Sequence, residues 1–178
     1  MQLQDREILN KYILSLFGVE EFISNEGNFK TLRHAAQPEL IDDGFDEEGK
    51  SYILQNLLMV NFDIEDELFS KLETYDSNIK EYVEHISENR NNMIDLKYFQ
   101  YFAVLFTEIF LDRYFNSKEK LLIDINEFID KENKKIKKDK RKYSYFEEDD
   151  LNKLAYYMAT GSGKTLIMHI NFLQFLNY

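Results

Sequence analysis

One segment limits the possible folds of this chain more than any other. Residues 95–115, DLKYFQYFAVLFTEIFLDRYF, would be apolar on nearly every side of a helix. Such a helix has no polar face to leave in water, so other elements must enclose it. The stretch is long enough to suggest a membrane span, but polar and charged residues interrupt it: Lys97, Gln100, Glu108, Asp112 and Arg113. The sequence therefore predicts a central helix that other helices cover.

The scarcity of turn-forming residues favours the same fold class. The 178 residues include six Gly and one Pro, too few for the many tight turns of an all-β sandwich or barrel. Helical patterns recur at 3–17, 39–43, 51–59 and 64–74, and from Ser77 and Asn116 onward. We therefore expect a mainly α protein whose residues 1–135 form a helical domain.

Composition excludes several classes of protein. The chain has no Cys, so disulfides, thiolate metal sites and cysteine nucleophiles are ruled out. A signal peptide would need a basic start, whereas the first residues, MQLQDREILN, include acids. These features predict a cytoplasmic protein with no membrane segment.

Charge is distributed unevenly along the chain. The net charge is −11, yet residues 131–142, KENKKIKKDKRK, hold eight basic and two acidic side chains. The acidic remainder is a poor electrostatic match for nucleic acid, although the basic run can contact a phosphate backbone. We expect residues 136–150, which pass from basic to acidic, to be a linker.

A glycine-rich motif stands near the end of the chain. An apolar run at 154–158 has the character of a β-strand, and the residues after Thr165 have the periodicity of a helix. The order of strand, glycine turn and helix is the context that a phosphate-binding loop requires. The residues that we predict to bind nucleotide are Thr160, Gly161, Ser162, Gly163, Lys164 and Thr165.

Each residue type in the motif suits this chemistry. Gly161 and Gly163 let the backbone curl so that N–H groups face the phosphates. Lys164 can reach the β- and γ-phosphates, and the Thr165 hydroxyl can ligate Mg²⁺. The expected cofactors are therefore ATP and Mg²⁺, and residues 151–178 are expected to begin a P-loop nucleotide-binding domain.

The segment from Met158 to Thr165 resembles motif I of superfamily 2 helicases and translocases. It is most similar to the DEAD/DEAH-box type found in the motor subunits of type I and type III restriction enzymes. Those motors carry A-T-G-x-G-K-T without the first glycine of the general pattern, and Met158 stands in that position here. The resemblance covers residues 151–178. It implies a RecA-like α/β motor domain that acts on DNA in preference to RNA, with restriction or modification subunits as partners.

The sequence contains only part of what such a motor needs. No D-E-x-x box for the metal and the attacking water follows Thr165, and no second motor lobe with an arginine finger is present. We expect an amino-terminal piece of a helicase, with no catalytic residue of its own and no useful rate of ATP hydrolysis. A single strand at 154–158 would also lack a neighbour to pair with.

Two other hypotheses remain open. The chain can be a helical protein-interaction domain whose P-loop is vestigial, and in that case it has no affinity for nucleotide to lose. It can also be another kind of P-loop protein, such as a kinase, although the spelling A-T-G-S-G-K-T argues against this.

Overall fold

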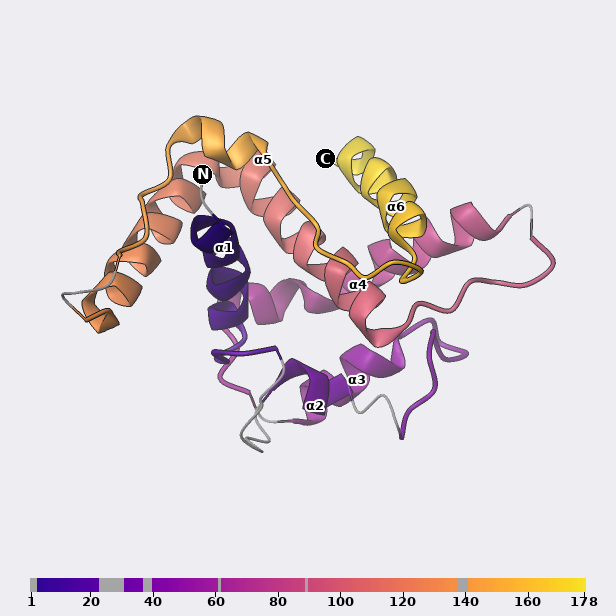
Figure 1. Ribbon diagram of the computed structural model, residues 1–178. Coiled ribbons are helices and arrows are strands. Elements are labelled where there is room, and N and C mark those ends of the chain that lie inside the picture. The colour runs from indigo at the N-terminus through magenta and orange to yellow at the C-terminus, as the bar shows by residue number, and fades with distance from the viewer. Residues whose placement is uncertain (1–2, 23–30, 37–39, 61, 89, 138–140) are drawn as a thin grey trace.

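The computed structural model describes residues 3–22, 31–36, 40–60, 62–88, 90–137 and 141–178. These residues form a helical protein (Figure 1). Its elements, in chain order, are α1 (Leu3–Leu16), α2 (Leu32–Ala36), α3 (Tyr52–Met59), α4 (Asp66–Ser87), α5 (Tyr98–Lys135), the 3₁₀ helix η1 (Glu148–Asn152) and α6 (Lys164–Asn177). The expectation of a mainly α fold is confirmed.

The first half of α5 is the centre of the molecule, as its composition predicts. Val104 and Leu105 are 0% exposed and Ile109 is 1% exposed. Helices α1, α4 and α6 all pack against α5. The apolar stretch is therefore enclosed by helices.

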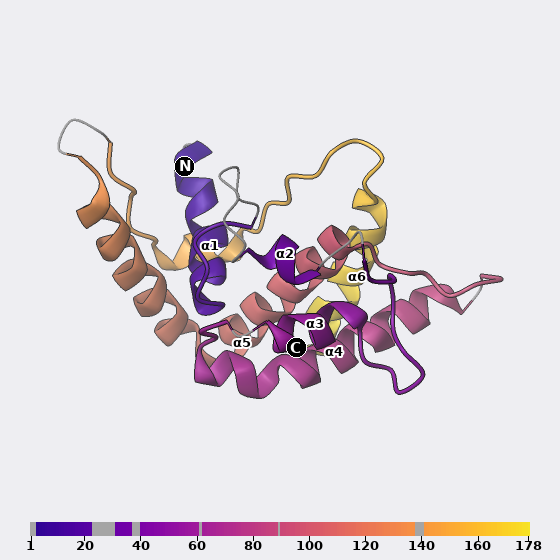
Figure 2. The ribbon, with the colours of Figure 1, turned by 90° about the horizontal axis from the view of Figure 1, so that it is seen from below.

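Helix α5 bends where the sequence predicts a new helix to begin. Ser117 has non-helical backbone angles, with φ −157° and ψ 53°, one residue beyond the expected start at Asn116. The helix then continues to Lys135, and its second half diverges from the body of the molecule (Figure 2).

Two expected helices, 64–74 and a second from Ser77, are one continuous helix, α4. Ser77 does not cap a new helix, because its hydroxyl donates to the carbonyl of Glu73 one turn earlier, at 3.0 Å. The start is also later than expected. The N–H of Glu65 donates to the carbonyl of Leu16 at 2.8 Å, so the chain is tied to the end of α1 before α4 begins.

The expected helix at 39–43 is wrong for its described part, residues 40–43, which are not helical. Its predicted start, Pro38 and Glu39, lies outside the described residues. The short helix in this region is instead α2, which buries Leu32, Ala35 and Ala36. Helix α3 matches its expected range, with the Ser51 hydroxyl accepting from the Leu54 N–H at 3.0 Å as its N-cap.

Buried polar contacts join the helices. The Ser51 N–H donates to Asp76 of α4 at 2.9 Å, and Tyr101 of α5 donates to the same carboxylate. Arg113 of α5 donates to the hydroxyl of Tyr12 in α1 at 2.8 Å and pairs with Glu65. These contacts satisfy the polar groups that the helices bury.

Candidate phosphate-binding loop

The predicted nucleotide-binding residues lie at the N-terminus of α6. Lys164 is the first residue of the helix, and Gly163 is its N-cap. Gly161 and Gly163 have positive φ angles of 81° and 92°, a conformation that glycine adopts without steric cost. Thr160 and Gly161 form the turn before the helix. The structure thus places all six predicted residues in one loop and the first turn of the helix that follows.

Local hydrogen bonds shape the loop. The Ser162 hydroxyl donates to the carbonyl of Ala159 at 2.7 Å, and the Ser162 N–H donates to the same carbonyl at 3.3 Å. The loop is therefore closed on itself over four residues before the helix starts.

The two residues expected to contact phosphate and metal are open to solvent. Lys164 and Thr165 are both exposed. No side chain caps α6, and the first N–H groups of a helix have no partner within it. An anion at this position can therefore meet a lysine, a hydroxyl and free backbone donors together.

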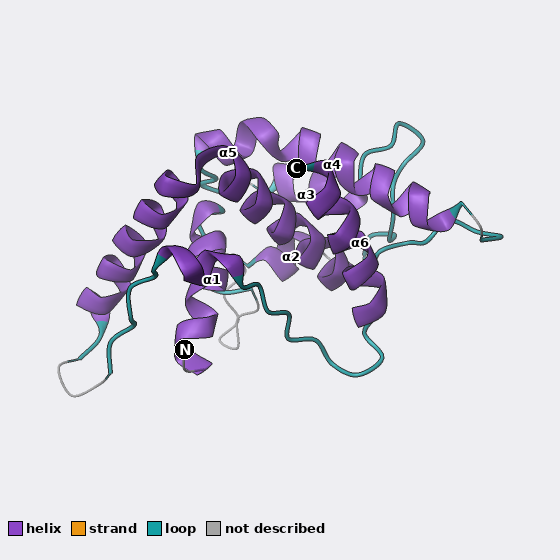
Figure 3. Cartoon of the chain, turned by 90° about the horizontal axis from the view of Figure 1, so that it is seen from above, coloured by secondary structure: helices purple, strands orange, loops and turns teal. Residues whose placement is uncertain are grey.

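The strand expected at residues 154–158 is absent, which corrects the prediction of a strand before the loop. Residues 153–159 are irregular, and no strand occurs in the part of the chain that the structure describes (Figure 3). A lone strand has no neighbour for its backbone groups. The segment instead runs beside α5, where the hydroxyls of Tyr156 and Thr107 are hydrogen-bonded at 2.5 Å.

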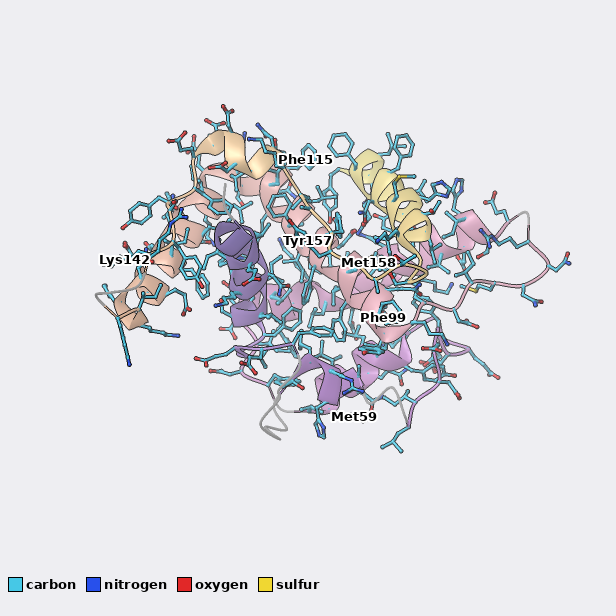
Figure 4. All side chains as sticks on the ribbon, viewed as in Figure 1. Met59, Phe99, Phe115, Lys142, Tyr157 and Met158 are labelled. Atoms are coloured by element: carbon cyan, nitrogen blue, oxygen red, sulfur yellow. The ribbon has the colours of Figure 1, made fainter. Side chains whose placement is uncertain are left out.

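An apolar cleft of about 860 Å³ lies between this segment and the helices. Phe102 and Phe106 of α5, Ile13 of α1 and Ser162 of the loop line it. Phe99, Tyr157 and Met158 also line it and are labelled in Figure 4. An aromatic cleft of this size is large enough for a small molecule.

Gln100 of α5 contacts the loop, a role that was not predicted from the sequence. Its Nε2 donates to the carbonyl of Ser162 at 2.9 Å, across 62 residues of sequence. Its Oε1 accepts from the N–H of Lys97 at 2.9 Å, which caps α5. The side chain is 8% exposed. A glutamine in the first turn of a helix is a capping signal, and no pattern in the sequence indicates its second contact.

The other end of α6 is fastened at Glu108. This carboxylate, 0% exposed, accepts from Gln174 of α6 at 2.7 Å and from Tyr178 at 3.1 Å. Asn78 of α4 donates to it at 2.8 Å. Burial raises the pKa of Glu108 above its ordinary value, although these hydrogen bonds favour the ionised form and oppose the rise.

Among the described residues, no cluster of three or more His, Asp or Glu side chains can hold a metal ion. The acidic run 147–150 opens η1, which confirms the expected helix start. A Mg²⁺ ion at this site would therefore rely on the Thr165 hydroxyl, the phosphates and water.

Comparisons with known proteins give no family. No protein-family model matches the chain, and neither a curated protein nor a solved structure does. No helix in the described ranges is long and apolar enough to cross a membrane.

Proposed function

We propose that this chain binds Mg²⁺–ATP through residues 160–165. One observation carries the proposal: two glycines with positive φ lead directly into a helix whose first two residues, Lys164 and Thr165, are exposed. The curled backbone and the helix N-terminus offer donors to phosphate oxygens. Lys164 adds a positive charge, and Thr165 offers a hydroxyl to the metal.

The wider role that we propose follows from the resemblance of the motif to superfamily 2 motors. In this proposal the chain is the amino-terminal part of a cytoplasmic, ATP-dependent DNA helicase or translocase of a restriction system. DNA and restriction or modification subunits would be its partners, and the helical domain of residues 1–135 would be an accessory module. The start of a RecA-like domain at 151–178 belongs to the same proposal. These 178 residues are proposed to bind nucleotide, not to hydrolyse it.

A titration with nucleotide tests the proposal. Calorimetric titration of the purified chain with Mg²⁺–ATP should show binding, and Lys164→Ala should weaken it at least about tenfold, the effect of losing about 1.4 kcal/mol at a charged contact. Thr165→Ala should reduce the dependence of the affinity on Mg²⁺. The control is Lys134→Ala, which removes the same charge from an exposed position in the basic run. Equal affinity of the wild type and Lys164→Ala would contradict the proposal.

The alternative function is a helical interaction module with a vestigial loop. The exposed apolar side chains of α6 favour it: Met168, Phe172, Phe175 and Leu176 are each more than half exposed. Exposed apolar clusters mark interaction surfaces. A chain that shows no heat of binding with Mg²⁺–ATP, and an identical result for Lys164→Ala, would favour this function.

A further inference from the structure

The Ser162–Gly163 peptide lies against the first turn of α5. The Ser162 carbonyl accepts from Nε2 of Gln100 at 2.9 Å. Every described peptide bond is trans. In a trans peptide the C=O and the following N–H point in opposite directions. The Gly163 N–H therefore points away from Gln100.

Gly163 and Gln100 also approach each other closely. A Cβ atom added to Gly163 would lie 2.4 Å from Nε2 of Gln100, which is closer than such atoms can come. The loop thus rests directly on a buried side chain of α5. Gln100 is held from its other side as well, because its Oε1 is engaged by the Lys97 N–H. Its amide is therefore fixed in orientation before it meets the loop.

We propose that Gln100 is a positioning residue for the phosphate-binding loop. It holds the Ser162 carbonyl against α5 and so directs the Gly163 N–H outward, next to the free donors at the start of α6. The helical body thereby contributes to nucleotide affinity without touching the nucleotide. This inference rests on the proposed function and adds to it a residue that lies outside the motif.

The substitution Gln100→Glu separates the two contacts of this side chain. A glutamate in this position still accepts from the Lys97 N–H, since Glu and Gln both serve in capping boxes. It cannot donate to the Ser162 carbonyl while ionised, and its oxygen faces that carbonyl instead. We expect a loss of about tenfold or more in Mg²⁺–ATP affinity by calorimetric titration, because the partly buried Ser162 carbonyl is left without its donor.

Two comparison variants distinguish positioning from general weakening. Gln100→Ala should lose the cap as well, so both its melting temperature and its affinity should fall. Gln174→Ala should loosen α6 at its far end and lower the melting temperature, with a smaller loss of affinity than Gln100→Glu. If affinity simply follows melting temperature across the three variants, the positioning role is wrong.

A second measurement does not depend on nucleotide. The amide proton of Gly163 should change its NMR chemical shift and exchange rate in Gln100→Glu. The amide proton of Ile167, which donates to the Gly163 carbonyl at 3.0 Å, should change less. If the wild type binds Mg²⁺–ATP and Lys164→Ala does not, but Gln100→Glu binds like the wild type, the inference fails and the proposed function stands. If the wild type does not bind, the proposed function fails, and an unchanged Gly163 amide would overturn the positioning role too.

Discussion

The first half of α5 and helix α6 are both rich in apolar residues, yet the protein treats them differently. In α5, Val104, Leu105 and Ile109 are at most 1% exposed, because helices cover several sides of it. In α6 only Ile167, Ile170 and Gln174 are buried, and the opposite side of the helix is exposed. Apolar composition alone therefore does not determine burial. The number of neighbouring elements does.

The largest difference between the two helices should appear when an apolar side chain of each is shortened to alanine. Leu105→Ala should lower the free energy of unfolding by about 2–5 kcal/mol, because it opens a cavity in the fully buried core that the surrounding side chains fill only in part. Phe172→Ala removes a side chain that is 64% exposed, and we expect a change within about 0.5 kcal/mol. Urea unfolding followed by circular dichroism measures both values. Equal losses would show that α6 is covered as fully as α5.

A smaller effect is expected where the two helices meet. Gln174 donates to the Val104 carbonyl at 2.9 Å and to Glu108 at 2.7 Å. Gln174→Ala should cost about 1–3 kcal/mol, because two buried acceptors lose a donor. Hydrogen exchange should rise in α6 and stay low in α4. His169→Ala, at an exposed position of α6, is the control. Exchange that rises equally in all helices would mean that α6 is not a separate unit of stability.

The smallest effect that we predict is a change with pH. The folded protein raises the pKa of Glu108 above its ordinary value of 4.5, so the folded state holds this proton more tightly than the unfolded state does. The resulting stability is present in full below pH 4.5 and is lost as pH rises through the raised pKa.

Melting curves of the wild type and Glu108→Gln, recorded at a series of pH values from below 4.5 upward, measure the effect. The wild type should lose stability relative to the variant as pH rises. The slopes are compared rather than the absolute values, since the variant also changes the contact with Gln174. Parallel curves would show that Glu108 has the same pKa in both states.

Local patterns predicted the elements that depend on local forces. The starts of α3 and α6, and the bend near Asn116, follow from capping and from glycine chemistry close by in the sequence. The predicted break before Ser77 was wrong, because a serine hydroxyl can bond to the preceding turn as well as cap a new helix.

Contacts between distant residues were not predictable in the same way. The six loop residues were predicted from their types and spacing, and their binding of nucleotide stays a prediction. Gln100 was not found, since its contact with Ser162 depends on how α6 docks. The strand at 154–158 was expected from its apolar character and its position before the glycine turn, although it would lack a neighbour to pair with. The described chain provides no partner strand, and the segment lies beside α5 instead.

The first half of α5 and helix α6 run in parallel (Figure 1). Gln100, near the start of α5, bonds to Ser162 two residues before α6, and Glu108, further along α5, bonds to Tyr178 just after the end of α6. A parallel pair requires the chain to return along its own length first. The hydrogen bonds that dock α6 therefore close loops of 62 to 70 residues, whereas those between α4 and α5 close 25 to 41. Longer loops cost more entropy to close, so α6 should dock after α4 has paired with α5 and should detach before that pair separates. The proposed phosphate-binding loop is then complete only once α6 has docked, and a nucleotide bound there would stabilise the docked state by mass action.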